Sequence, residues 1–251
     1  MKIHCGNNVK WIYESLKLVA FFVAFVALCV VLSAFGHTIV NSFRDSERSS
    51  ADAEIDKSET IVIDPGHGGF DGGAVSSDGV YEKDLNLAVS KYLRAFFTLG
   101  GYDAVMTRTD DTSLTSANHT ESKKRGDLFG RVEFTQKYDN PIFLSIHQNK
   151  FEIQKYSGLQ VYYSKHASDS EIIAKKIQKY AKVLLQPDNN REAKPAGSSI
   201  LVLNNMKTPA VLVECGFLSN PSEAKLLEED TYQRKLAFII YLAVNDCLRK
   251  N

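Results

Sequence analysis

Two histidines and two glutamates stand where they could carry out hydrolytic chemistry. His67 lies in a glycine-rich segment, DPGHGGFDGG, directly after a short apolar run, and His147 and Glu214 each follow another apolar run. Glu82 begins a segment with helical spacing a short distance beyond His67. Imidazole nitrogens and a carboxylate are the donors that a catalytic zinc ion takes from a protein, with one position left open for water. The sequence therefore predicts a zinc site made by His67, Glu82 and His147, with Glu214 as the group that moves the proton.

Glu214 is the strongest single candidate because of its position. Residues 211–213 before it are apolar, so a carboxylate placed there loses hydration unless it has a partner. Its pKa is therefore expected to rise. In the predicted reaction zinc lowers the pKa of a bound water to about 7, and the resulting hydroxide attacks an amide carbonyl. Glu214 accepts the proton and later gives one to the leaving amine.

Each of these residues also has a simpler interpretation. A lone histidine at the end of a strand is more often a hydrogen-bonded surface or core residue, and we predict this role for His119 and His166. Glu82 alone would favour the start of a helix through the helix dipole. The spacing of these residues by itself therefore does not decide between a metal site and these simpler roles.

The elements that must position these residues alternate between strand and helix. Short apolar runs predict strands at 61–63, 103–107, 142–146, 159–163, 200–203 and 210–213. Helical spacing predicts helices at 83–99, 128–138, 171–185 and 232–248, and the residues 220–223 (NPSE) predict a further helix start with a capping box. The polar segment 110–127 is expected to be a long surface loop.

This alternation predicts an α/β fold in which a mostly parallel, twisted sheet is flanked by helices. Ligands of such sheets bind at the carboxyl ends of the strands. His67, His147 and Glu214 each follow a predicted strand, so we expect their side chains to converge on one edge of the sheet.

The N-terminal part has a different character. Residues 18–35 carry no charge and are near the length of a membrane-spanning helix. Lysines precede this run, so the positive-inside rule predicts a cytosolic N-terminus and an extracytoplasmic remainder. The predicted organisation is a cytosolic N-terminus at 1–17, a single transmembrane anchor or signal segment at 18–35, a polar linker at 36–59 and a catalytic domain at 60–250. A cleaved signal peptide is the alternative, which would release a secreted enzyme instead of a protein of the cell membrane.

Charge and cysteine content exclude other classes of function. Lys plus Arg and Asp plus Glu number 30 each, and no basic stripe with interleaved aromatic residues is present, so nucleic acid is not an expected partner. Cys215 and Cys247 lie in the predicted catalytic domain without the spacing of a metal cluster. A disulfide between them is possible in an oxidising compartment, but we expect two buried thiols.

Several ordered motifs resemble one enzyme family. They are residues 63–69 (IDPGHGG), Glu82-Lys83, Thr107-Arg108, 145–149 (SIHQN) and 213–220 (VECGFLSN). Over about residues 60–250 the chain resembles the zinc-dependent N-acetylmuramoyl-L-alanine amidases of the amidase-3 family. The resemblance implies that His67, Glu82 and His147 bind Zn²⁺ and that Glu214 is the catalytic carboxylate. It also implies hydrolysis of the amide between N-acetylmuramic acid and L-alanine of the peptidoglycan stem peptide.

Within this family the chain looks like the spore germination-specific, CwlD-type amidases. The hydrophobic N-terminal segment, the lack of wall-binding repeats in the chain and the polar insert before residues 126–128 carry this likeness. It implies removal of stem peptides during sporulation, leading to muramic-δ-lactam in the spore cortex, with an accessory sporulation lipoprotein as partner. Gln148 and Cys215 depart from the small or aliphatic residues common in the family, but neither change removes a ligand.

Two other functions use the same residues. A zinc carboxypeptidase or endopeptidase acting on stem peptides could employ the same ligands and base, and a wall-binding protein could keep the fold without activity. The sequence also does not identify the groups that orient the ligand histidines. Asp64 and Asn149 lie near them in sequence, although local turn bonding is expected for Asp64, and Arg131 is expected to be a surface charge.

Overall fold

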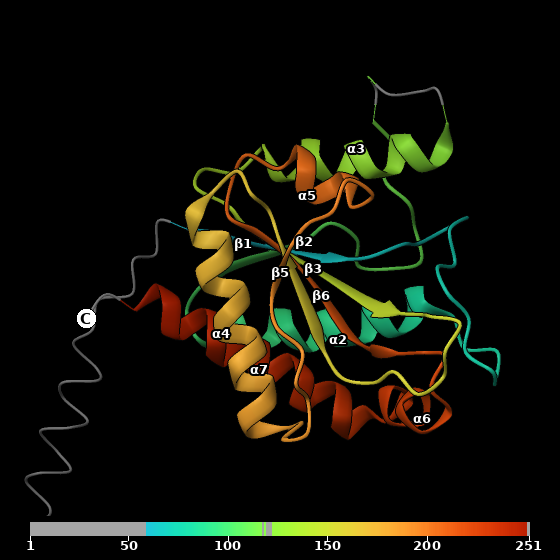
Figure 1. The fold of residues 1–251 in the computed structure, drawn as a ribbon. Helices are drawn as coiled ribbons and strands as arrows, with labels where there is room; N and C mark the ends of the chain where they lie inside the picture. The colour runs from blue at the N-terminus through green and yellow to red at the C-terminus, as the bar shows by residue number, and fades with distance from the viewer. Residues whose placement is uncertain (1–58, 117, 119–121, 250–251) are drawn as a thin grey trace, which may run out of the picture. The chain divides into compact units, whose positions relative to one another are not determined.

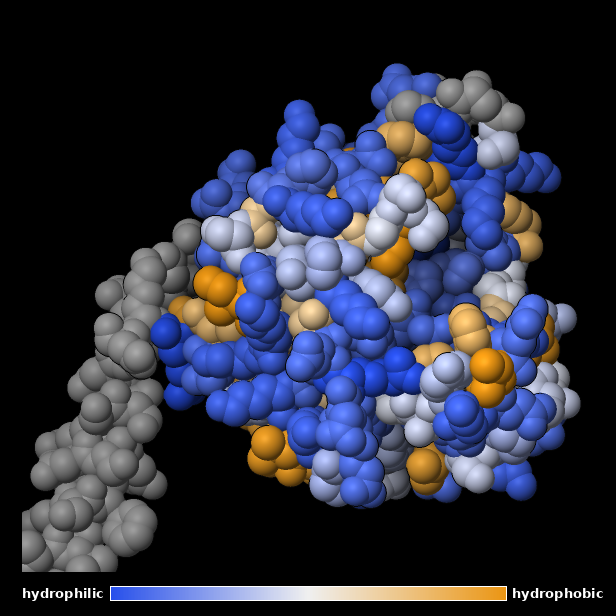
Figure 2. Space-filling view, in the orientation of Figure 1, coloured by the Kyte–Doolittle hydropathy of each residue, from blue (hydrophilic) through white to orange (hydrophobic). Residues whose placement is uncertain are grey.

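The computed structural model describes residues 59–116, 118 and 122–249 (Figure 1). The predicted membrane segment at 18–35 lies outside these residues. Within them, every helix is too short or too polar to cross a bilayer. The face of the molecule in Figure 2 is largely hydrophilic, with apolar side chains in small, scattered groups.

The described residues form six strands and six helices. The strands are β1 (Thr60–Pro65), β2 (Asp103–Met106), β3 (Ile142–Asn149), β4 (Gln160–Tyr163), β5 (Lys194–Pro195) and β6 (Ala210–Phe217). The helices are α2 (Glu82–Leu99), α3 (Lys123–Thr135), α4 (Ser168–Leu184), α5 (Leu201–Asn205), α6 (Pro221–Glu228) and α7 (Asp230–Leu248).

The strands form one sheet in the order β2-β1-β3-β6-β4-β5. The four strands from β2 to β6 are parallel, as the sequence predicts. β4 runs antiparallel to β6, and β5 is parallel to β4, so the sheet as a whole is mixed. The parallel part contains β1, β3 and β6, whose carboxyl ends therefore meet at one edge.

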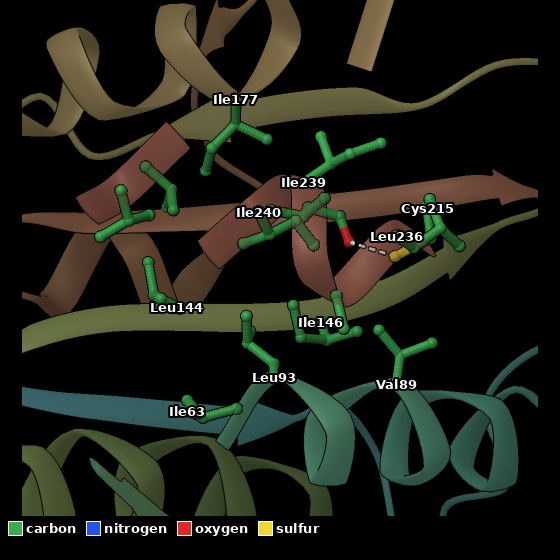
Figure 3. Packing of buried hydrophobic residues seen from close by; sticks show 14 of the residues in the cluster. Ile63, Val89, Leu93, Leu144, Ile146, Ile177, Cys215, Leu236, Ile239 and Ile240 are labelled. Carbon is green, nitrogen blue, oxygen red and sulfur yellow. Dashed lines mark hydrogen bonds between the residues drawn. The ribbon is translucent and has the colours of Figure 1, made fainter. Parts of the chain in front are cut away.

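Helices cover both faces of this sheet (Figure 1). One face packs against α2, α4 and α7. Figure 3 shows Ile63 and Leu144 from the sheet facing Leu93 of α2 and Ile240 of α7, with Ile177 of α4 in the same core. All five of these side chains are fully buried. Burial of this apolar area is the main force that holds the sheet and the three helices together.

The second face carries a smaller core beneath α3 and α5. Val62 and Phe143 point to this side, because successive residues of a strand project to opposite faces. Val202, Leu203 and Met206, in and just after α5, pack onto them. Residues 200–203, predicted as a strand, are thus mostly helical: the side chains of Val202 and Leu203 are buried against the sheet, whereas Leu201 is exposed.

Two other sequence-based expectations need correction, and one strand was missed. The helix predicted at 128–138 begins earlier, at Lys123, because the Ser122 hydroxyl accepts a hydrogen bond from the backbone of Arg125 and caps it. The predicted surface loop is correspondingly shorter. β5 was not expected, since its two residues are exposed and carry no apolar signature.

The start of α6 also differs in part from its prediction. Asn220 caps the helix by accepting hydrogen bonds from the backbone of Ser222 and Glu223, as expected. The Glu223 carboxylate, however, does not close a capping box. It accepts instead from the backbone N–H groups of Gly158 and Phe217, and so ties the end of β6 to the loop before β4.

Candidate metal centre

His67, Glu82 and His147 come together at the carboxyl edge of the parallel strands. Nε2 of His67 lies 3.2 Å from Oε2 of Glu82, and Nδ1 of His147 lies 2.9 Å from Oε1 of Glu82. One donor atom from each residue falls within 4.8 Å of the others. The predicted convergence of these three side chains is therefore present in the structure.

The loop after β1 brings His67 to this point through an unusual backbone. His67 has a φ of 61°, in the left-handed region that residues with a side chain seldom adopt. The neighbouring Gly66 is equally constrained, since a Cβ there would lie 2.2 Å from Nε2 of His147. The backbone at Gly66 therefore packs directly against the ring of His147.

Glu82, the first residue of α2, is buried and held by backbone groups. Its Oε1 accepts a hydrogen bond from the N–H of Gln148 at 3.1 Å, and its Oε2 accepts one from the N–H of Ala74 at 2.8 Å. Burial alone would raise the pKa of Glu82, but hydrogen bonds from His147 and His67 hold it well below its ordinary value. The carboxylate is thus ionised and fixed in place at neutral pH.

Asp71 is a member of this site that sequence reasoning missed. Its Oδ2 lies 2.9 Å from Nδ1 of His67, and its Oδ1 accepts a hydrogen bond from the N–H of Gly73. These contacts indicate that Nδ1 of His67 donates its proton to a hydrogen bond with Asp71, so that Nε2, which faces Glu82, is the nitrogen that can bind a metal. Burial opposes protonation of His67, but Glu82 and Asp71 outweigh it and raise the pKa of the ring. The available signal was an aspartate four residues after the histidine, in the same glycine-rich loop.

Glu214 lies in β6 directly opposite His147 in β3. Its Oε2 is buried and has no hydrogen-bond partner among the described residues, although the residue as a whole is half-buried. Burial raises the pKa of Glu214 to about 7, against the opposing effect of His147. Burial and a raised pKa agree with the sequence-based expectation for this carboxylate.

The two cysteines among the described residues do not take part in the site. Cys215 points to the opposite face of the sheet from Glu214 and is fully buried in the core of Figure 3. Burial raises the pKa of its thiol far above the ordinary value. Cys247 is half-buried, and both cysteines are free thiols. The prediction of two buried thiols is confirmed for Cys215 and holds in part for Cys247.

A buried ionic cluster lies beneath the His67 loop and corrects two predictions. Arg131, expected at the surface, is 2% exposed and pairs with both Asp64 and Asp127. Asp64 does not bond within a local turn. It accepts hydrogen bonds from the hydroxyl groups of Thr107 and Ser145, at 2.6 and 2.7 Å. Burial would raise the pKa of Asp64, but Arg131 and the two hydroxyl groups hold it below the ordinary value.

The remaining histidines are less informative. Nε2 of His166 lies 3.0 Å from the carbonyl oxygen of Asn204, in keeping with its expected role as a hydrogen-bonded residue away from a metal. His119 lies outside the described residues.

The donor set suits a zinc ion. Two imidazole nitrogens and one carboxylate are a common protein contribution to catalytic zinc, which keeps a further position open. Harder cations such as Mg²⁺ and Ca²⁺ prefer oxygen ligands throughout. The unpartnered buried oxygen of Glu214 adds an acceptor beside this set without being needed as a fourth ligand. The arrangement can therefore hold a metal and accept a proton at adjacent positions.

Comparison with known proteins identifies relatives over most of the described residues. A family model described as N-acetylmuramoyl-L-alanine amidase matches residues 61–246. The germination-specific N-acetylmuramoyl-L-alanine amidase of Bacillus subtilis (strain 168) is 38% identical over 186 residues, covering 73% of this chain and 77% of that protein. The AmiA amidase of Escherichia coli (strain K12) is 30% identical over 222 residues, covering 72% of this chain and 73% of that protein.

Solved structures agree with these sequence matches. The CwlD amidase from Clostridioides difficile, solved in complex with the GerS lipoprotein, matches with a TM-score of 0.70 and 41% identity. The match covers 75% of this chain and 98% of that chain. The catalytic domain of CwlV from Bacillus (Paenibacillus) polymyxa var. colistinus matches with a TM-score of 0.62 and 29% identity, covering 75% of this chain and 97% of that chain.

Proposed function

This chain belongs to the amidase-3 family of N-acetylmuramoyl-L-alanine amidases, and from that premise we propose a zinc-dependent reaction with defined roles for four residues. The enzyme is an amidase of peptidoglycan. Its substrate bond is the amide between the lactyl group of N-acetylmuramic acid and L-alanine of the stem peptide. His67, Glu82 and His147 hold the zinc ion, and Glu214 is the catalytic carboxylate. The observation that carries this proposal is the meeting of the three donors beside the unpartnered oxygen of Glu214.

The residues of the chain divide the chemistry between them. Nε2 of His67, Nδ1 of His147 and the carboxylate of Glu82 face one another and form the metal ligands. Zinc bound there supplies Lewis acidity toward a water molecule and the substrate carbonyl. Glu214 accepts a proton from the attacking water at its free oxygen and delivers it to the leaving nitrogen, for which its raised pKa is suited.

The biological setting we propose is spore formation. The relative from Bacillus subtilis is named germination-specific, and the relative of known structure from Clostridioides difficile was solved with a lipoprotein. On this basis the enzyme removes stem peptides from cortex peptidoglycan, so that a deacetylase can remove the N-acetyl group and the freed amine can close muramic-δ-lactam. An accessory lipoprotein is the proposed partner in this process.

The proposed location is the outer side of a membrane. Residues 18–35 anchor the chain as one membrane-spanning helix, and residues 60–250 act outside the cytoplasm. This part of the proposal is supported by the sequence: an uncharged apolar run preceded by lysines.

Fragment analysis tests the proposed reaction. The full-length protein, purified in detergent, is incubated with zinc and with spore peptidoglycan, and the released fragments are identified by mass spectrometry. Free stem peptides that begin with L-alanine, absent after chelation, support a zinc amidase. Shortened peptides would indicate a zinc peptidase instead. Release that persists after chelation would refute the role of zinc.

A further inference from the structure

Arg108 is a buried arginine to which the proposed reaction assigns no role. It follows β2 in the Thr107-Arg108 motif, and only 4% of it is exposed. The hydrogen bonds of its guanidinium group go to backbone carbonyl oxygens. A buried charge loses its hydration, so these carbonyl groups are its main compensation. The backbone segments to which these carbonyl groups belong indicate the role of Arg108.

The guanidinium joins the two backbone segments that carry ligands. Its Nη2 atom donates two hydrogen bonds, one to the carbonyl oxygen of Gly66 at 3.0 Å and one to that of Lys83 at 2.8 Å. Gly66 precedes His67, and Lys83 follows Glu82. Arg108 therefore bridges the loop of one ligand and the first turn of the helix that presents another.

Further contacts restrain the His67 loop from the same side. Nε of Arg108 donates to the carbonyl oxygen of Pro65 at 3.0 Å, and Arg131 donates to the same oxygen at 2.9 Å. Arg131 also donates to the carbonyl oxygen of His67 at 2.7 Å. Three consecutive carbonyl groups are thus bound by two guanidinium groups. These contacts hold His67 in its left-handed backbone conformation, which a residue with a side chain does not adopt readily.

We infer that Arg108 is a positioning residue of the metal centre: it sets the spacing between His67 and Glu82 before a metal arrives. This inference rests on the proposed function, because it assumes that these residues bind zinc. A ligand set that is already arranged binds a metal more tightly than one that must be ordered, and groups that orient ligands typically contribute about 10- to 100-fold in metal affinity.

A lysine variant distinguishes this positioning role from the effect of the positive charge alone. The conservative variant Arg108→Lys keeps the charge, but its single ammonium nitrogen cannot replace the three guanidinium nitrogens, which together reach the carbonyl groups of the His67 loop, of Lys83 and of Asp110. Arg94→Lys is the matched control, since Arg94 donates through Nε to the carbonyl oxygen of Ala104, on the β2 side of α2. Wild type and both variants are prepared as full-length protein without metal.

Zinc affinity and the Co²⁺ absorption spectrum are then measured, with thermal unfolding of the metal-free proteins as the check on folding. We expect Arg108→Lys to bind zinc about 10- to 100-fold more weakly than wild type, with an altered Co²⁺ spectrum. Arg94→Lys is expected to match wild type in both. Wild-type affinity and an unchanged spectrum in Arg108→Lys would overturn the inference while leaving the proposed function intact.

Two other outcomes are also decisive. If wild type binds no zinc, the proposed centre fails and this inference fails with it. If Arg108→Lys does not fold without metal, Arg108→Gln is measured in the same way, because its amide keeps a donor without the buried charge. Weak zinc binding by folded Arg108→Gln supports the inference. Unfolding of this variant as well would make Arg108 a residue required for folding, and would overturn its specific role at the metal centre.

Discussion

His147 and Glu214 lie opposite one another on the neighbouring parallel strands β3 and β6, so their side chains project from the same face of the sheet. The two residues nevertheless have different environments. Nδ1 of His147 is engaged with Glu82, whereas Oε2 of Glu214 has no partner among the described residues. This difference is the structural reason for assigning metal binding to His147 and proton transfer to Glu214.

Replacement of Glu214 by glutamine should separate these two roles. We expect Glu214→Gln to retain zinc, because the three proposed ligands are unchanged, and to lose activity by about 10²- to 10⁴-fold, the usual contribution of a group that transfers protons. Zinc content is measured by elemental analysis, and activity by release of stem peptides. A variant that is purified without zinc, under conditions in which wild type retains it, would make Glu214 a ligand.

The same substitution should stabilise the metal-free protein at neutral pH. The pKa of Glu214 is raised to about 7 in the folded state, so the folded state binds this proton more tightly than the unfolded chain does. Between the unfolded pKa of about 4.3 and the folded value of about 7, the unfolded chain releases this proton while the folded state keeps it, so the free energy of unfolding of wild type falls as pH rises. The Glu214→Gln variant has no ionisable group at this position, so its free energy of unfolding does not fall in this way. Because the residue is partly exposed, we expect a gain of about 1 to 2 kcal/mol at pH 8 and little at pH 4.

Urea unfolding of both chelator-treated proteins at pH 4, 6 and 8 measures this gain. The difference between them should grow with pH and level off above pH 7. A difference that is the same at all three pH values would show that Glu214 is not in a desolvated site.

Asp71 should affect metal affinity without binding the metal. Its carboxylate holds Nδ1 of His67, and loss of the charge in Asp71→Asn weakens that contact, so we expect zinc affinity to fall about 10- to 100-fold. Asp111→Asn is the control. The Asp111 carboxylate also contacts this loop, accepting a hydrogen bond from the N–H of Gly69, but its side-chain partner is Lys83. Competition with a zinc-sensitive dye measures both affinities, and equal affinities would refute the role of Asp71.

The parts of the fold that follow from local pattern were predictable. The apolar runs before His67, His147 and Glu214 are strands, and their order along a parallel sheet brings the three residues to one edge. The helical spacing after Glu82 likewise gave α2. These features depend on side-chain periodicity, which is visible in the sequence itself.

The supporting groups were not predictable in the same way. Arg131 bonds to Asp64, 67 residues away, and only packing of α3 against the sheet brings the two together. A charged residue on a helix with many polar neighbours is normally exposed, so its burial had no local signal. Ile200 to Leu203 illustrate the opposite case. The apolar side chains of Val202 and Leu203 were a correct signal of burial, but burial on the face of a sheet suits a helix as well as a strand.

Two glycines with the same backbone preference offer a final test of the centre. Gly73 and Gly79 both have positive φ values, 69° and 86°, so alanine strains the backbone at either position by about 1 to 2 kcal/mol. Only Gly73 touches the site. A Cβ there would lie 2.6 Å from Oε2 of Glu82 and 2.7 Å from Cδ2 of His67, whereas a Cβ at Gly79 would meet nothing within 4 Å.

We therefore expect both variants to lose stability, Gly73→Ala more than Gly79→Ala because its Cβ also displaces Glu82 and His67, and Gly73→Ala alone to lose zinc affinity, by at least about 10-fold. Urea unfolding of the metal-free variants measures the shared strain, and zinc titration measures the separate effect. Equal zinc affinity in the two variants would show that the pocket around Glu82 and His67 can give way to an added methyl group. In that case the close packing of the loop would not be what holds these two ligands in place.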